Sequence, residues 1–130
     1  MSLTRDDIFA IQDIETKELL VPQWGGKPVF IRQLTRGEQD EYLRRQYGST
    51  KMRQDIRAKN QQIDGINLYG HDAYLCVCGI CDAEGKRIFS KGDIEKLTEK
   101  NGEAIGFIAK AIVEFSGMGP DVEVLDKTKN

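Results

Sequence analysis

Three cysteines within six positions are the residues of this 130-residue chain whose type and spacing could do chemistry. They are Cys76, Cys78 and Cys81 in the stretch "DAYLCVCGIC", and the only histidine of the chain, His71, lies just before them. Zinc prefers thiolate and imidazole ligands, and the Cys-x-x-Cys spacing of "CGIC" also occurs in redox-active dithiols. The stretch therefore has three interpretations: a metal site, a redox site, or part of an apolar core.

Helical periodicity opposes both chemical interpretations. We expect a helix from about Asn67 to Asp82, and at 100° per residue Cys76 and Cys78 then lie about 160° apart around its axis. Three such thiols cannot face one ion, and the sequence lacks the second ligand pair that structural zinc sites have. A redox-active cysteine needs a helix N-terminus to stabilise its thiolate, whereas Cys78 falls in mid-helix. We interpret His71 as a surface residue at the start of this helix.

We therefore expect the three cysteines to be buried. The residues around them are apolar on every side of the predicted helix, and free cysteine is among the residue types most often buried. A small metal-binding or thiol regulatory domain that uses Cys76, Cys78 and Cys81 remains the alternative function, and near-stoichiometric zinc in the purified protein would favour it.

The composition is that of an ordinary globular protein. The net charge is −2, with 31% charged and 39% hydrophobic residues, so nothing favours a nucleic-acid or membrane partner. The longest apolar stretch, "AYLCVCGIC", is about half of the roughly 18 residues that a membrane span needs. The start "MSLTRDDIF" does not resemble a signal peptide, and three closely spaced cysteines make no disulfide framework, so we expect a reducing cytoplasm.

The first third of the chain predicts a short helix and a β-hairpin. Thr4 and the acidic residues after it indicate a helical turn or two ending at Ile11. Two β-favouring segments follow, 18–23 and 27–33, split by Trp24-Gly25-Gly26, which is a hairpin signal. The prolines in these segments, Pro22 and Pro28, indicate the edge of a sheet.

Capping signals predict the later helices. Thr35, with Glu38 three residues on, forms a capping box for a helix that ends near Gly48. Ser90 caps a short helix, and Asn101 caps one that runs to Gly117 with a broad apolar face. The segment 49–64 reads as a weak helix or a mobile loop. We expect one α+β domain over residues 1–120, a hairpin or small antiparallel sheet packed against four to five helices, and a flexible tail over 121–130.

A cluster of three carboxylates is a possible acid–base site by residue type alone. Glu38, Asp40 and Glu41 are close in sequence, but no histidine, lysine or metal motif accompanies them. No glycine-rich phosphate loop is present either. We therefore expect neither an active site nor a cofactor.

Three phrases of the sequence resemble one protein family. They are "VFIRQLTRGEQDEYL", "AYLCVCGICDAEGKRIFSKGDIEKL" and "AIGFIAKAIVEFSG", which together cover most of the chain from Val29 to Gly117. Their order and spacing resemble the tail assembly chaperones of bacteriophages with long, non-contractile tails, the siphophages. Members of that family often carry Val, Ala and Leu where this chain has its cysteines, which agrees with core packing.

The resemblance implies a non-enzymatic function. Such proteins bind the tape measure protein of the phage tail, keep it soluble and help gather tail tube subunits, the latter through a longer product of ribosomal frameshifting. They act in the host cytoplasm and are absent from the finished virion. The resemblance also implies self-association into a homo-oligomer. A generic adaptor without a chaperone role is a third possibility.

A chaperone for a helical client needs an apolar surface that accepts amphipathic helices. The last predicted helix and the hairpin carry more large apolar side chains than so small a core needs. The candidate partner-binding residues are Trp24, Phe107, Ile112, Phe115 and Met118. The alternative is that these side chains simply close the core.

Overall fold

The structure is a computed structural model that describes residues 1–47 and 69–118. The segments 49–64 and 121–130, for which the sequence predicts mobility, lie outside the described residues. The elements in chain order are α1 (Arg5–Ala10), β1 (Thr16–Val21), β2 (Lys27–Arg32), α2 (Arg36–Tyr47), α4 (His71–Gly79), β3 (Ile80–Cys81), α5 (Ile94–Leu97) and α6 (Gly102–Phe115). One 3₁₀ turn, η1 (Pro22–Trp24), closes the hairpin, and another, η2 (Lys91–Asp93), precedes α5. The α+β prediction is confirmed.

The sheet is antiparallel with the order β1-β2-β3. The predicted hairpin is confirmed, and its turn places Gly25 and Gly26 at φ values of 73° and 72°, where a side chain would be strained. The edge prediction holds for β1 but is wrong for β2, which is the central strand. Pro28 is tolerated there because β3 pairs only with Phe30 and Ile31, further along β2.

The cysteine helix is shorter than its sequence predicts. α4 ends at Gly79, and Ile80 adopts an extended conformation with φ −83° and ψ 132°. Ile80 and Cys81 then form β3, so Cys81 belongs to a strand and not to the helix. The apolar run could not show this boundary, because the hydrogen-bonding partners of β3 lie on β2, about 50 positions earlier in the chain.

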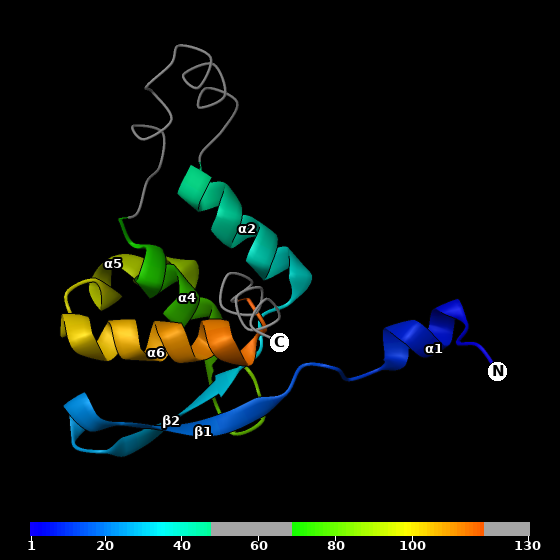
Figure 1. Cartoon of the computed structure of the whole chain (residues 1–130), viewed down its shortest axis with the longest axis horizontal. Coiled ribbons are helices and arrows are strands. Elements are labelled where there is room, and N and C mark those ends of the chain that lie inside the picture. Colours follow the sequence, from blue (N-terminus) through cyan, green and yellow to red (C-terminus); the bar gives the residue numbers. More distant parts are fainter. Residues whose placement is uncertain (48–68, 119–130) are drawn as a thin grey trace, which may run out of the picture.

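The helices are layered on the hairpin with α4 in the centre (Figure 1). α6 packs between the hairpin and α4, and α4 also contacts α2 and α5. The whole of α4 except Asp72 is buried, whereas α1 lies apart from the other elements, joined to β1 by an extended segment (Figure 1). No helix in the described ranges is long and apolar enough to cross a membrane.

Local capping rules place α2 and α6. The predicted capping box at the start of α2 is confirmed by bonds from the Glu38 N–H to Thr35 Oγ1 and from the Thr35 N–H to the Glu38 carboxylate. Asn101 Oδ1 accepts the Ala104 N–H at the start of α6. At its end the Met118 N–H bonds to the Val113 carbonyl, a Schellman closure with Gly117 at φ 74°.

α4 and α6 approach each other closely at Gly79, the last residue of α4. A Cβ atom built on Gly79 would lie 2.5 Å from Cδ1 of Ile112, a fully buried residue of α6. Only glycine therefore allows α4 and α6 to pack at this distance.

We expect Gly79→Ala to lower the free energy of unfolding by about 1–3 kcal/mol, since an added methyl in a filled core forces neighbours to shift. Chemical denaturation measures the change. Gly102→Ala is the matched control, because a Cβ at Gly102 meets nothing within 4 Å. A Gly79→Ala protein as stable as the wild type would contradict this description of the helix contact.

Candidate functional site

The three cysteines lie in the core, as predicted. Cys76 and Cys78 are fully buried and Cys81 is 3% exposed, all as free thiols. Burial raises the pKa of the Cys76 thiol to about 12 and also raises the pKa of Cys78 and Cys81. The thiols therefore stay protonated near neutral pH and lack the thiolate that redox chemistry requires. Among residues 1–47 and 69–118 no group of three His, Cys, Asp or Glu side chains is arranged to hold a metal ion.

His71 is not the surface residue that its position in the sequence indicates. Its ring centroid lies 4.3 Å from that of Tyr42, because α2 packs over the start of α4, and the side chain is buried. Burial lowers the pKa of His71, against an opposing effect of Asp72. Nε2 has no hydrogen-bond partner within the described part of the chain.

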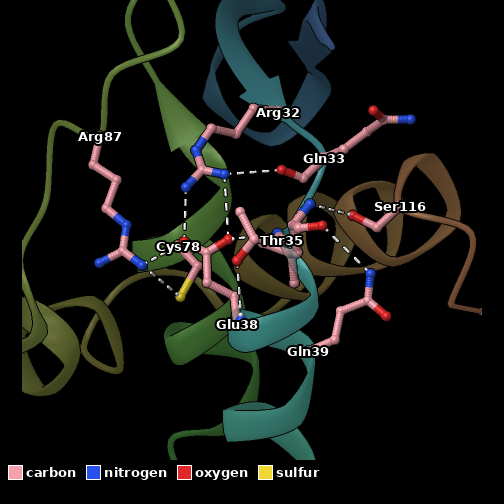
Figure 2. A network of polar contacts seen from close by, with 9 residues as sticks. Arg32, Gln33, Thr35, Glu38, Gln39, Cys78, Arg87 and Ser116 are labelled. Carbon is pink, nitrogen blue, oxygen red and sulfur yellow. Dashed lines mark hydrogen bonds and ion pairs between the residues drawn. The ribbon is translucent and has the colours of Figure 1, made fainter. Parts of the chain in front are cut away.

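The strongest cluster of charges surrounds the carboxylate of Glu38 (Figure 2). Arg32 donates two hydrogen bonds to it, from Nη1 to Oε1 at 3.2 Å and from Nη2 to Oε2 at 2.7 Å. The Thr35 N–H donates to Oε1 at 2.8 Å, and Arg87 Nη2 donates to Oε2. The Glu38 and Arg32 side chains are only 10% and 11% exposed.

This cluster connects β2, α2 and the segment after β3, and it leaves the Glu38 carboxylate no free acceptor position for a substrate. The carboxylate accepts four hydrogen bonds, which fills its acceptor positions. Hydrogen bonding to Glu38 raises the pKa of Arg87, so the guanidinium stays charged. The other two carboxylates considered for acid–base work pair elsewhere: Asp40 with Arg36, and Glu41 with Arg44. Glu38, Asp40 and Glu41 thus each pair with an arginine rather than with one another.

A second set of polar contacts joins the end of β2 to the end of α6. The Leu34 N–H donates to Ser116 Oγ at 2.9 Å, and Gln33 Nε2 donates to the Phe115 carbonyl at 3.1 Å. Figure 2 shows Ser116 beside this segment. These contacts fix the position of α6 relative to the sheet, and with it the side chains that α6 presents outward.

The candidate partner-binding residues do not form one surface. Ile112 is fully buried against Gly79, so it belongs to the core. Phe107 is 37% exposed on the outer side of α6. Phe115 and Met118 are partly buried against the core, and the Lys17 ammonium lies 4.8 Å from the Phe115 ring centroid.

Trp24 belongs to a different feature, a pocket of about 470 Å³ beside the hairpin turn. The residues that line it are Trp24, Phe89, Asp93, Lys96, Leu97 and Lys100. Sequence patterns do not show this pocket, because one wall comes from η1 and the others come from residues 89–100, in and around η2 and α5. Phe107 is not among its lining residues.

The N-terminal segment is a third apolar feature. Residues 1–18 are all exposed. The large apolar side chains among them are Met1, Leu3, Ile8, Phe9, Ile11 and Ile14. The spacing of Ile8, Ile11 and Ile14 could have indicated an apolar face, but it could not show that this face stays exposed in the part of the chain that the structure describes.

We expect Glu38→Ala to destabilise the protein by about 3 kcal/mol, because two arginines would lose a largely buried partner. Urea or guanidinium unfolding measures this loss. Glu41→Ala, on the same helix, removes only a pair with the exposed Arg44 and should cost about 0.5 kcal/mol. Equal losses for the two variants would contradict the central place of Glu38.

Comparison with known proteins identifies the family. A family model described as "Phage tail assembly chaperone" matches residues 8–129, and no curated protein matches the chain. Among solved structures, the chain is similar to the tail assembly chaperone of bacteriophage HK97, with 20% sequence identity and a TM-score of 0.55 over 78% of this chain and 85% of that chain. The likeness in structure shows a common fold. Because the family match runs from within α1 to the penultimate residue, the chain belongs to the phage tail assembly chaperone family.

Proposed function

We propose that this chain is a non-enzymatic chaperone that binds the phage tape measure protein, keeps it soluble and helps recruit tail tube subunits. Membership of the tail assembly chaperone family supports the general role. The tape measure protein, the tube protein reached through a longer frameshifted form, the host cytoplasm and absence from the virion are the specific expectations that the resemblance implies.

The observation that carries this proposal is the outer ridge of α6, which we define as Phe107, Ala111 and Phe115. These residues recur every four positions, so their side chains line up along the helix. Ridges of this kind pack into the groove between ridges of another helix. Phe107 is exposed, while Ala111 and Phe115 are partly buried. The ridge is therefore most accessible at Phe107.

The ridge suits an amphipathic helical client. The adjacent, inward face of α6 carries Ile105, Ile108 and Ile112, which are buried in the core. Exposed charges of both signs, Lys110 and Glu114, flank the ridge. A client helix could therefore bury its apolar stripe on the ridge while its polar residues meet a mixed-charge rim.

The chemistry of the described residues also supports a binding role. The Glu38 carboxylate is saturated with hydrogen bonds, and the cysteine thiols are buried and protonated. The buried ionisable groups of the core thus serve packing, and what remains for function is surface.

We expect Phe107→Ser to reduce the soluble fraction of coexpressed tape measure protein relative to wild type. Loss of a central aromatic contact typically costs about 1–2 kcal/mol, roughly a 5- to 30-fold weaker complex. The soluble fraction is measured after centrifugation of the lysate, and circular dichroism checks that the variant is folded.

Ile88→Ser is the matched control, since Ile88 is 56% exposed outside α6. It should solubilise the client as the wild type does. The proposal fails if the wild-type chain leaves the tape measure protein insoluble, and the assignment of the ridge fails if Phe107→Ser behaves as the wild type does.

A further inference from the structure

His71 is a buried titratable side chain that the proposed function does not use. It is the first residue of α4, is 9% exposed, and is the only histidine of the chain. Its Nε2 atom is buried without a hydrogen-bond partner within the described residues. Native structures contain few such atoms, because an unpaired buried polar group costs free energy. Histidine changes its charge near neutral pH, so this position is a candidate for a pH-dependent contact.

The ring of His71 forms part of the contact between α2 and α4. Its centroid lies 4.3 Å from that of Tyr42, and the two ring planes are tilted by 40°. One turn further along α2, the Arg45 guanidinium lies 4.9 Å from the ring centroid of Tyr74, which is buried one turn along α4. The second half of α2 is thus attached to the first turn of α4 through aromatic rings.

The start of α2 is attached in a different way, without His71. Glu38, in the first turn, accepts hydrogen bonds from the Thr35 N–H and from two arginines outside the helix. The imidazole takes no part in these bonds. α2 therefore has two attachments that can be separated, one at Glu38 and one at Tyr42 and Arg45.

A positive charge on His71 is poorly accommodated in this contact. An imidazolium donates from both nitrogens, so Nε2 would become a donor without an acceptor. The residue also lies at the N-terminal end of α4, where the helix dipole disfavours a cation. Burial is the main effect that lowers the pKa of His71, while Asp72 opposes this effect and Arg45 adds to it. The neutral ring is therefore the form that fits.

The side of His71 that faces α5 and α6 adds no net negative charge. A cavity of about 380 Å³ is lined there by His71, by Asp72 and by Lys100, and the rest of its described lining is uncharged. The charged groups around the imidazole are thus two cations, Arg45 and Lys100, and one carboxylate, Asp72. The face of the Tyr42 ring attracts a cation, but it does not replace the water that burial removes.

We propose that the His71 contact is a pH-sensitive switch in the packing of α2. Protonation of the imidazole releases the second half of α2, from Tyr42 to Tyr47, from α4, while the bonds to Glu38 keep the first turn in place. In the released state water solvates the imidazolium, which is also separated from Arg45. The release uncovers Tyr74. The switch belongs to the chain alone and needs no client.

The neutral contact stabilises the fold above pH 6.5 and is lost on acidification. Because folding lowers the pKa of His71 from its unfolded value of 6.5, the folded state binds fewer protons than the unfolded state just below that pH. The stabilisation therefore disappears as the pH falls through the lower pKa of the folded chain. Ordinary carboxyl groups titrate at about pH 4, so a change between about pH 6.5 and about pH 5 reports on His71.

NMR on the full chain tests the switch, because a single histidine gives one set of imidazole signals. We expect these signals to titrate with a midpoint below 6.5. Over the same pH range the amides of residues 42–47 should lose protection from hydrogen exchange, after correction for the intrinsic pH dependence of exchange, while those of α6 keep theirs. Emission of Trp24, at the hairpin turn, should stay constant, which distinguishes local release from global unfolding.

His71→Phe keeps a ring against Tyr42 but cannot be protonated. We expect the protection of residues 42–47 in this variant to be the same at about pH 7 and at about pH 5. His71→Gln, which is also uncharged, takes its place if the phenylalanine variant does not fold, and the same result is expected.

Arg45→Gln tests the electrostatic part of the switch with a readout that a purely structural role would leave unchanged. Removal of the cation should raise the titration midpoint of His71. Arg44→Gln, at the neighbouring exposed arginine that pairs with Glu41, is the matched control and should leave the midpoint unchanged.

The proposal is overturned if residues 42–47 keep their protection after His71 is protonated, or if the wild type and the uncharged variants lose it equally. A midpoint at or above 6.5, equal midpoints in the two arginine variants, or a simultaneous change in Trp24 emission also contradicts it. None of these assays contains a client, so they fail independently of the chaperone role.

Discussion

Burial of the Glu38 carboxylate is the constraint on which the arrangement of the molecule depends. A carboxylate that is only 10% exposed must be compensated, and the compensation comes from the connection between β2 and α2 and from the segment after β3. Arg32 ends β2, Thr35 caps α2, and Arg87 follows the turn after β3. Satisfying one charge therefore fixes the angle at which the chain leaves the sheet and holds the segment that leads to α5.

The central position of α4 follows from this frame. With α2 held on one side, α6 on another and β3 continuing into the sheet, α4 has no face left for solvent except at Asp72. Its cysteines are then small apolar residues among others. The cysteines, the most reactive residue types in the chain, thus occupy buried positions. The surface features available for interaction are the outer ridge of α6, the pocket at Trp24 and the N-terminal residues 1–15.

Local rules allowed much of the fold to be predicted from the sequence. Thr35 and Glu38, Asn101, and Gly117 place the ends of α2 and α6 because each signal acts within a few residues. Long-range effects could not be predicted in this way. The end of α4 depends on pairing with β2, the burial of His71 depends on α2, and the Glu38–Arg87 pair joins residues 49 positions apart.

The candidate site shows the same difference between local signals, which the sequence contains, and long-range packing, which it does not show. Helical spacing identifies the apolar face of α6 but cannot tell its inner side from its outer side at Ile112 and Phe107, because the position of α4 decides that. The sequence indicates Trp24 as an aromatic residue of the hairpin, whereas its partners in the pocket, Phe89 and Leu97, come from a part of the chain more than 60 residues away.

Hydrogen exchange of the chain, alone and in complex with the tape measure protein, tests the central claim that a fixed core presents its client surface on α6. Amide protection reports local opening and burial residue by residue. We expect the client to increase protection along the outer ridge of α6 from Phe107 to Phe115, with α4 as strongly protected before binding as after it. Unchanged protection of α6, or a large change confined to α4 around Cys76 and Cys78, would contradict the account.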